Sequence, residues 1–322
     1  MNRRSIVGAG ALAATAGLAI HQSKASHVPY RRPRRSHVAV LRCDSYERTP
    51  QVVEHGLQLV RPSVQGKRVL LKPNLVEYSP AAPINTHPML IAAVIDALYR
   101  LGAASVIVAE GPGHIRDTDL LLHESGLGAQ LEILKQASFV DLNFDSVTRV
   151  VPGTGLTQLK ELWLPTTVQS AEVVISMPKI KTHHWAGVTL SLKNSFGILP
   201  GSIYGWPKNI LHWQGIDNSI VELAASVPIH FVIADGIEAM EGNGPLHGPM
   251  RRLGCLVFAD DPVAADATCC RLMGIDPGSV RHLQMASPLG NLDMANIEQR
   301  GESVERVMQQ FDLLPEFAYL RG

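Results

Sequence analysis

The chain has 322 residues, enough for one large α/β domain or two moderate ones. Hydrophobic residues make up 46% and charged residues 18%, a globular composition that argues against intrinsic disorder. The formal net charge is zero, so a general nucleic-acid binder, which needs a basic excess, is not expected. The four cysteines show no C-x-x-C spacing, and an iron–sulfur cluster or a zinc site held by cysteine alone is therefore not expected.

Residues 1–25 have the pattern of an export signal. Arg3 and Arg4 precede an apolar stretch rich in Ala and Gly, and Ser23 and Ala25 are the small residues that a signal peptidase requires. The paired arginines predict delivery to the periplasm by the twin-arginine export machinery. An uncleaved N-terminal membrane anchor is the alternative, although the stretch is shorter than the roughly 20 residues of a spanning helix. Cleavage after Ala25 would leave a slightly acidic chain without a stable membrane span.

The rest of the chain is predicted to be a basic linker (26–36), a single α/β domain (37–305) and a C-terminal tail (306–322). Apolar runs bounded by Gly and Pro predict strands over 38–41, 68–72, 105–109, 139–142, 173–177, 229–234 and 255–259. Helical patterns cover 50–59, 88–101 with Thr86 as its cap, 117–125, 128–136, part of 188–195, 218–226 and 263–273. Residues 143–172 are irregular and indicate short antiparallel strands or an insertion. This alternation predicts a mostly parallel, doubly wound sheet with helices on both faces.

Five of the predicted strands run directly into polar residues. These are Lys72-Pro-Asn74, Glu110-Gly-Pro-Gly113, Pro178-Lys179, Asp235-Gly236 and Asp260-Asp261. Each could be ordinary turn chemistry. Because the carboxyl ends of parallel strands share one edge of a sheet, the five together favour a common ligand crevice at that edge.

The segment 178–200 concentrates cationic and polar groups just after a buried strand. Lys179, Lys181 and Lys193 are candidate binders of a phosphate or carboxylate group. A solvated lysine is the alternative for each, but Lys193 lies between two apolar stretches, where a lysine needs a partner or must reach solvent. The full set of candidate substrate-binding residues is Lys72, Asn74, Lys179, Lys181, Lys193, Asn194 and His212.

His183 and two carboxylates are the candidates for acid–base chemistry or metal binding. Asp235, Glu238 and Glu241 are spaced by three residues, which would place them on one face of a helix. Such a face suits a divalent cation or an acid–base pair, and an ordinary acidic turn is the alternative. We therefore expect His183, Asp235 and Glu241 to supply catalytic groups or metal ligands. Asp266, within an apolar helix, needs a partner such as a lysine of the 179–193 group.

Several of these segments, in this order, are similar to the domain-of-unknown-function 362 family. The matching segments are Lys72-Pro-Asn74, Thr86-His-Pro88, Pro178 to His183, Leu192-Lys-Asn194, Phe196-Gly197, Asp235-Gly236, Glu241 to Pro245, Asp260 and Ala264-Ala-Asp266. The resemblance spans residues 38 to 300 and implies a single α/β domain. It also implies a link to iron–sulfur proteins, since some members carry a ferredoxin-like cysteine module, but this chain lacks that module.

Two functions remain open from the sequence. The first is an exported enzyme that acts on a small anionic molecule, with a divalent metal as a candidate cofactor. The second is a non-catalytic protein that binds a metabolite or cofactor or assists maturation of a partner, in which case no acid–base group should matter. An electron-transfer accessory is a weaker third alternative.

Overall fold

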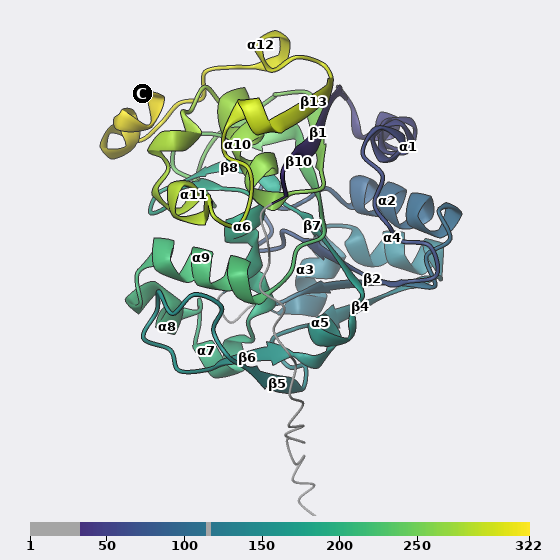
Figure 1. The fold of residues 1–322 in the computed structure, drawn as a ribbon. Helices are drawn as coiled ribbons and strands as arrows, with labels where there is room; N and C mark the ends of the chain where they lie inside the picture. The colour runs from purple at the N-terminus through teal and green to yellow at the C-terminus, as the bar shows by residue number, and fades with distance from the viewer. Residues whose placement is uncertain (1–32, 114–116) are drawn as a thin grey trace, which may run out of the picture.

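The structure, a computed structural model, describes residues 33–113 and 117–322 (Figure 1). The predicted signal peptide and linker residues 26–32 lie outside the described residues. The strands are β1 (Ser36–Arg42), β2 (Arg68–Pro73), β3 (Ser105–Glu110), β4 (Ala137–Asp141), β5 (Val147–Val150), β6 (Leu162–Pro165), β7 (Val173–Met177), β8 (Lys179–His183), β9 (Gly187–Thr189), β10 (Phe231–Met240), β11 (Met250–Arg251), β12 (Cys255–Ala259) and β13 (Ile297–Gly301).

The α-helices lie mostly between these strands, as the sequence predicts. They are α1 (Thr49–Leu59), α2 (Pro88–Arg100), α3 (Thr118–Glu124), α4 (Leu127–Leu134), α5 (Thr166–Ser170), α6 (Ser191–Asn194), α7 (Gly201–Tyr204), α8 (Asn209–Trp213), α9 (Ile216–Ser226), α10 (Pro262–Leu272), α11 (Arg281–Ala286) and α12 (Val304–Val307). The 3-10 helices are η1 (Tyr46–Arg48), η2 (Ser195–Ile198), η3 (Pro277–Ser279), η4 (Met294–Asn296) and η5 (Pro315–Arg321).

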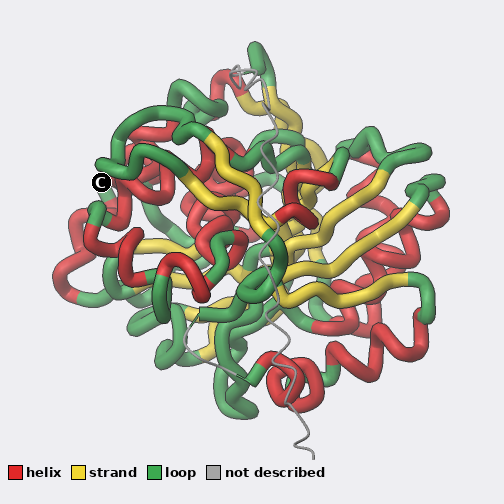
Figure 2. Tube along the Cα trace, turned by 90° about the horizontal axis from the view of Figure 1, so that it is seen from below, coloured by secondary structure: helices red, strands yellow, loops and turns green. Residues whose placement is uncertain are grey.

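In the described residues, eleven strands form one sheet with the main order β13-β1-β12-β10-β7-β2-β3-β4. The pairs β13–β1, β10–β7, β7–β2, β2–β3 and β3–β4 are parallel, and β12 runs antiparallel to both β1 and β10. The predicted fold class, a mostly parallel α/β sheet with helices on both faces, is confirmed. The strands and the flanking helices are seen from below in Figure 2.

The reversed direction of β12 changes one expectation about the crevice. Asp260 and Asp261 follow β12, so they lie at the edge of the sheet opposite to the carboxyl ends of β2, β3 and β7. Asp261 accepts a hydrogen bond from Ser36 Oγ at the beginning of β1 (2.6 Å) and caps α10 through the amide of Val263. Four of the five polar strand ends remain candidates for a shared site.

Two apolar layers bury the central strands on both faces. Alternate residues of β2, Val69 and Leu71, pack with α1, α2 and α4, while Leu70 faces the core formed with α9, α10 and α11. In β12, Val257 packs in the core with α9, α10 and α11, and Phe258 packs in the core with α1, α2 and α4. A strand buried on both faces reads as a continuous apolar run, which is why the sequence predicts these strands well.

The order of the strands reverses between β2 and β7. From β2 the chain moves outward through β3 and β4, and it then returns to add β7 on the other side of β2. In open α/β sheets a ligand crevice forms outside the carboxyl ends of the strands at such a reversal. The segments Lys72-Pro-Asn74 and Pro178–Lys179 leave the sheet at this point.

Two local predictions are corrected. Residues 235–240 continue strand β10 and do not form a helix, so the spacing of three does not place Asp235 and Glu238 on one face. Helix α2 is capped by the side chain of His87, which accepts from the Met89 amide, and not by Thr86. Thr86 Oγ1 instead donates to the Met177 carbonyl (2.6 Å) and ties the loop before α2 to β7.

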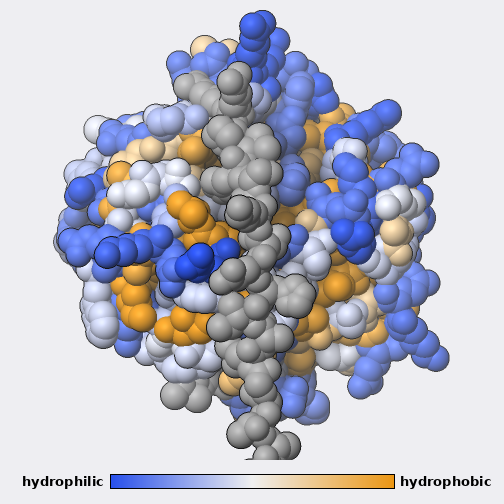
Figure 3. All heavy atoms as spheres, turned by 60° about the horizontal axis from the view of Figure 1, so that its bottom comes forward, coloured by the Kyte–Doolittle hydropathy of each residue, from blue (hydrophilic) through white to orange (hydrophobic). Residues whose placement is uncertain are grey.

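The predicted irregular segment and C-terminal tail also have defined structure. The segment 143–172 contains the antiparallel pair β5–β6, one of its two predicted alternatives. In the tail, Phe311 and Leu320 are buried against the core. On the visible part of the face in Figure 3, apolar residues lie in several places among hydrophilic ones. Within residues 33–113 and 117–322, no helix is both long and apolar enough to traverse a bilayer.

Candidate functional site

A cavity of about 300 Å³ lies at the carboxyl ends of β2 and β3, beside β8 and β9. Its lining is rich in nitrogen-bearing side chains set among apolar ones. The lining residues are Asn74, Leu75, Val76, Glu110, Gly111, Gly113, Lys181, His183, His184, Trp185, Thr189, Lys193, Asn194, Phe196, Gly197, Pro207, Lys208, His212, Pro245 and Leu246. Six of the predicted site residues are therefore brought together: Asn74, Lys181, His183, Lys193, Asn194 and His212.

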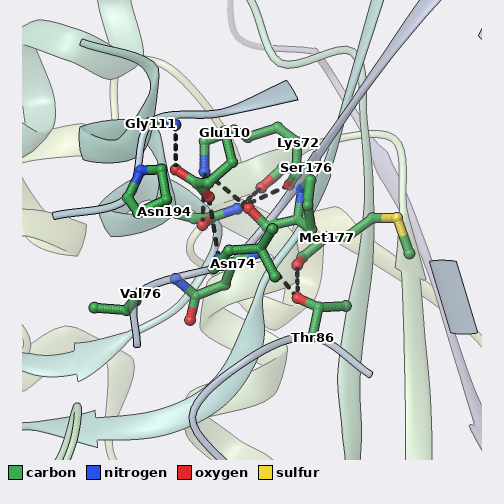
Figure 4. A network of polar contacts seen from close by, with 12 residues as sticks. Lys72, Asn74, Val76, Thr86, Glu110, Gly111, Ser176, Met177 and Asn194 are labelled. Carbon is green, nitrogen blue, oxygen red and sulfur yellow. Dashed lines mark hydrogen bonds and ion pairs between the residues drawn. The ribbon is translucent and has the colours of Figure 1, made fainter. Parts of the chain in front are cut away.

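Beneath the cavity lies a fully buried ion pair between Lys72 and Glu110, the last residue of β3. Lys72 Nζ also donates to Asn194 Oδ1 (3.1 Å) and to the Pro73 carbonyl (2.8 Å). Both carboxylate oxygens of Glu110 are occupied, since Leu75 N donates to Oε2 and Gly111 N to Oε1. Figure 4 shows this network. Lys72 is therefore held away from the cavity, although it was predicted to bind substrate.

Asn194 and Gly197 fit this ion pair closely. Asn194 Nδ2 donates to the Lys72 carbonyl and to Ser176 Oγ, both at 3.1 Å, so its amide is fully engaged. A Cβ atom at Gly197 would overlap Glu110 Oε1 and lie 2.8 Å from Lys72 Nζ. Glycine at 197 thus lets η2 approach the buried charges, an accommodation that no larger residue permits.

Lys193 presents a different environment for an ammonium group. Its Nζ lies 3.7 Å from the centroid of the Phe196 ring, and no carboxylate of the described residues lies within ion-pairing distance of it. Burial and, secondly, the charge of Lys72 lower the pKa of Lys193 to about 7. Near neutral pH this residue is divided between ammonium and free amine.

The short helix that carries Lys193 is fixed by a buried carboxylate. Asp266 of α10 accepts hydrogen bonds from the amides of Ser191 (2.7 Å) and Leu192 (2.9 Å), the first two residues of α6. Burial raises the pKa of Asp266 to about 8. Its partner is therefore the end of a helix and not a lysine, and α10 sets the position from which Lys193 enters the cavity.

Two further lysines line the cavity, and each already donates hydrogen bonds to oxygen atoms of the protein. Lys181 Nζ donates to the carbonyls of Ile84 (2.6 Å) and Pro245 (3.3 Å), and burial, followed by the nearby lysines, holds its pKa well below the usual range. Lys208 Nζ donates to Asn143 Oδ1, and burial lowers its pKa to about 8. Lys208 also has a left-handed backbone (φ +70°), which is strained for a residue with a side chain.

The ring of His183 has a protonation state dictated by its neighbours. Nδ1 accepts from the amides of Trp185 (2.9 Å) and Ala186 (3.2 Å), so it carries no proton. Burial and, after it, Lys193 hold the pKa of His183 well below its usual range, and the ring is neutral with its proton on Nε2. A histidine that ligates a metal through one ring nitrogen usually carries its proton on the other nitrogen, which donates a hydrogen bond. His183 is therefore a hydrogen-bond donor to the cavity and is poorly suited to be a base or a metal ligand.

His184 and His212 have the opposite orientation. Nδ1 of His184 lies 2.8 Å from the Gly244 carbonyl, and Nδ1 of His212 lies 3.1 Å from the Lys208 carbonyl. Because a carbonyl only accepts, both Nδ1 atoms carry the proton and both Nε2 atoms are acceptors in the neutral rings. Burial and, after it, the charge of Lys193 lower the pKa of His212 to about 4. The two rings pack around the exposed Trp185.

Two buried oxygens of the lining lack a hydrogen-bond partner among the described residues. They are Asn74 Oδ1 and Thr189 Oγ1, whose side chains are almost fully buried. In Figure 4 the Asn74 amide lies beside the ion-pair network and takes no part in it. An unpaired buried oxygen costs about 1–3 kcal/mol, so a donor group that reached either atom would be stabilised.

The remaining predicted residues lie elsewhere. Lys179 Nζ pairs with Asp235 Oδ2 (2.8 Å) and with the Tyr46 hydroxyl (2.9 Å), beside a second hollow formed by residues 78–88. Glu241 Oε2 accepts from the Asp312 amide (3.0 Å), and its Oε1 lies 3.6 Å from an Arg251 guanidinium nitrogen. Within the described parts of the chain, no group of three His, Cys, Asp or Glu residues is arranged to hold a metal ion. His183, Asp235 and Glu241 therefore do not form the predicted ligand set.

The sequence reasoning missed Glu110 as an ion-pair partner and Lys208, Thr189 and His184 as lining residues. Lys208 had a local signal, because it follows Trp206-Pro207 and precedes a helix in a segment with few charges. The roles of Thr189 and His184 depend on β9 and on the loop at Gly244, which no spacing in the sequence reveals.

Comparisons with known proteins identify the family. The model of the domain of unknown function DUF362 matches residues 69–271. The chain belongs to this family. It is also 29% identical, over 269 residues, to a thylakoid-associated protein of Synechocystis sp.; the match covers 79% of this chain and 79% of that protein. The DUF362 segment contains the strands that frame the cavity and every lysine and histidine of its lining.

Two solved structures resemble this DUF362 protein over part of their length. The lactate racemase apoprotein of Thermoanaerobacterium thermosaccharolyticum is 12% identical with a TM-score of 0.46, covering 76% of this chain and 58% of that one. A Thermotoga maritima protein is 11% identical with a TM-score of 0.42, covering 72% and 60%. The chain thus spans less than two thirds of either structure, and we base no functional argument on them.

Proposed function

We propose that this DUF362 protein is an enzyme that binds a small organic anion in the cavity between Lys193, Lys208 and His183. The observation that carries the proposal is the charge of the lining. Among the described residues, its only carboxylate, Glu110, is fully engaged by Lys72 and two backbone amides, and Lys193 has no anionic partner. A concave site with cations and donors and no free carboxylate favours an anionic ligand.

The apolar part of the lining supports an organic ligand. Leu75, Val76, Phe196 and Leu246 face the same cavity as the lysines. Ligand sites of this kind combine apolar walls with a few polar groups that fix the orientation. Asn74 Oδ1, unpaired among the described residues, would accept from a hydroxyl or a protonated group of the ligand.

Acid–base groups favour an enzyme over the alternative, a non-catalytic binding or maturation protein. Lys193, with a pKa lowered to about 7, and the Nε2 acceptors of His184 and His212 line one cavity. A group whose pKa lies near the working pH is the most effective one for proton transfer. A protein that only stores an anion would gain affinity from a fully charged lysine and has no need of these groups.

Calorimetric titration with a panel of small carboxylates and phosphates tests the proposal. We expect Lys193→Met to weaken binding of the best anion about tenfold, or about 1.4 kcal/mol. Lys160→Met is the matched control, because Lys160 is exposed and distant in sequence from the cavity segments. The proposal fails if no anion binds the wild-type chain or if both variants behave alike. If the bound anion is recovered chemically unchanged with every candidate co-substrate, the binding-protein alternative holds.

We also propose that the protein is exported through the twin-arginine pathway, on the strength of Arg3 and Arg4 in the sequence. Cell fractionation of the wild type and of an Arg3→Lys, Arg4→Lys variant tests this. Retention of the variant in the cytoplasm is expected, and equal distribution of both proteins would contradict export by this route.

A further inference from the structure

The amine of Lys193 has the surroundings of a reactive group. Asp266 holds the helix that carries it, and the face of Phe196 is the contact offered to Nζ. Lys72, the cation whose charge lowers the pKa of Lys193, is itself engaged by Glu110. A lysine amine in an apolar pocket near another cation is a nucleophile toward carbonyl groups.

Other groups of the lining can hold the charge of an anion without Lys193. The Lys208 ammonium group has further N–H donors besides the one that is hydrogen-bonded to Asn143, and His183 presents its Nε2–H. Both lie in the same lining as Lys193. A carboxylate can therefore be bound by Lys208 and His183 while an adjacent carbonyl carbon meets the Lys193 amine.

We propose that the ligand is a 2-oxo acid and that Lys193 captures its ketone carbon as a Schiff base. This inference rests on the proposed anion site and names its substrate class. The lone pair of the neutral amine attacks the carbonyl carbon, and the π electrons of the C=O bond move to its oxygen. The oxygen takes up protons and leaves as water, so the amine and the 2-oxo acid yield one imine and one water molecule.

The proton transfers in this step have candidate carriers in the lining. Attack by the amine leaves an N–H proton to be removed, and the carbinolamine oxygen must be protonated before it departs. The Nδ1 atoms of His184 and His212 face backbone carbonyls, which leaves Nε2 of each ring as the nitrogen that can take the first proton and return it. Asn74 Oδ1 can accept from the hydroxyl of the carbinolamine.

Reductive trapping tests the inference. The full chain is incubated with pyruvate, and separately with phenylpyruvate, in the presence of cyanoborohydride, which reduces an imine to a stable secondary amine. Intact-mass and peptide mapping then locate the adduct. We expect labelling at Lys193 about tenfold above that at the exposed Lys160. Lys193→Arg keeps the charge but removes the primary amine and should abolish the adduct, and Lys160→Arg should retain it.

A parallel titration separates this inference from the proposed function. Propanoate has the carboxylate of pyruvate without its ketone, and 3-phenylpropanoate matches phenylpyruvate in the same way. Binding of propanoate or 3-phenylpropanoate, together with no adduct at Lys193 from pyruvate or phenylpyruvate, would overturn the Schiff base and leave the anion site standing. Labelling spread equally over surface lysines would also overturn it. Absence of both binding and adduct would contradict the anion site together with the inference.

Discussion

Lys72 and Lys193 lie close together at the same edge of the sheet, yet the protein treats them in opposite ways. Lys72 is fully buried and engages a carboxylate, an amide oxygen and a carbonyl. Lys193 faces a cavity and contacts an aromatic ring. The difference shows that a position at this edge of the sheet does not determine the role of a lysine. The partners that the fold supplies decide whether its charge stabilises the protein or is left for a ligand.

The strongest test of the comparison removes the buried partner. Lys72→Met would leave the Glu110 carboxylate buried with only two backbone donors, and we expect a loss of about 3–5 kcal/mol in the free energy of unfolding. Urea denaturation measures this loss. The double variant Lys72→Met, Glu110→Gln should regain most of it, since no uncompensated charge remains. A single variant as stable as the wild type would show that the pair is not buried as described.

The pH dependence of stability should distinguish the second lysine. The pKa of Lys193 is about 7 in the folded protein against an ordinary value of 10.5, so the unfolded chain binds more protons between these values. Stability contributed by this group therefore rises with pH across that window, by at most about 1.4 kcal/mol per pH unit.

The difference in unfolding free energy between the wild type and Lys193→Met isolates this term from other titrating groups. The groups that interact electrostatically with Lys193 are Lys72, Lys181, His183, His212 and His282. A difference that stays constant from pH 7 to about pH 10 would contradict a lowered pKa for Lys193.

A third test crowds the ion pair without changing a charge. Gly197→Ala places a Cβ atom against Glu110 and Lys72, and we expect a loss of about 1–3 kcal/mol in the free energy of unfolding. Gly128→Ala is the matched control, since Gly128 lies within helix α4 and the nearest atom to its Cβ is at 3.5 Å. The control should be neutral or slightly stabilising. Equal effects of the two substitutions would mean that Gly197 is not in close contact with the pair.

The smallest expected effect concerns the donor role of His183. His183→Asn keeps an acceptor for the amides of Trp185 and Ala186 but has no donor at the position of Nε2. Binding of the best anion should weaken by about 1 kcal/mol with stability nearly unchanged. His183→Gln can place an N–H near the position of Nε2 and should retain more affinity. Calorimetry measures the affinity of both variants for the anion. Weaker binding by His183→Gln than by His183→Asn would contradict the assigned ring orientation.

Much of the fold was predictable because its central strands are buried on both faces and appear as uninterrupted apolar runs. The site was predictable in part, since Asn74, Lys193 and His183 follow or adjoin such runs. Asp235 and Glu241 were misplaced because β10 extends beyond its apolar half, and a spacing of three has no meaning on a strand. The direction of β12, which removes Asp260 and Asp261 from the site, is a tertiary property that no local pattern encodes.

The buried Lys181 has a consequence for how molecules reach the cavity. Its Nζ joins two loops, one before α2 through Ile84 and one after β10 through Pro245. Parting these loops would strand a polar group at a cost of about 1–3 kcal/mol. Elsewhere in the lining, Trp185 and His212 meet edge to face, and Trp185 is 59% exposed. We therefore expect solutes to enter and leave past the Trp185 indole, because rotation of this ring would open the cavity while the two hydrogen bonds of Lys181 stay intact.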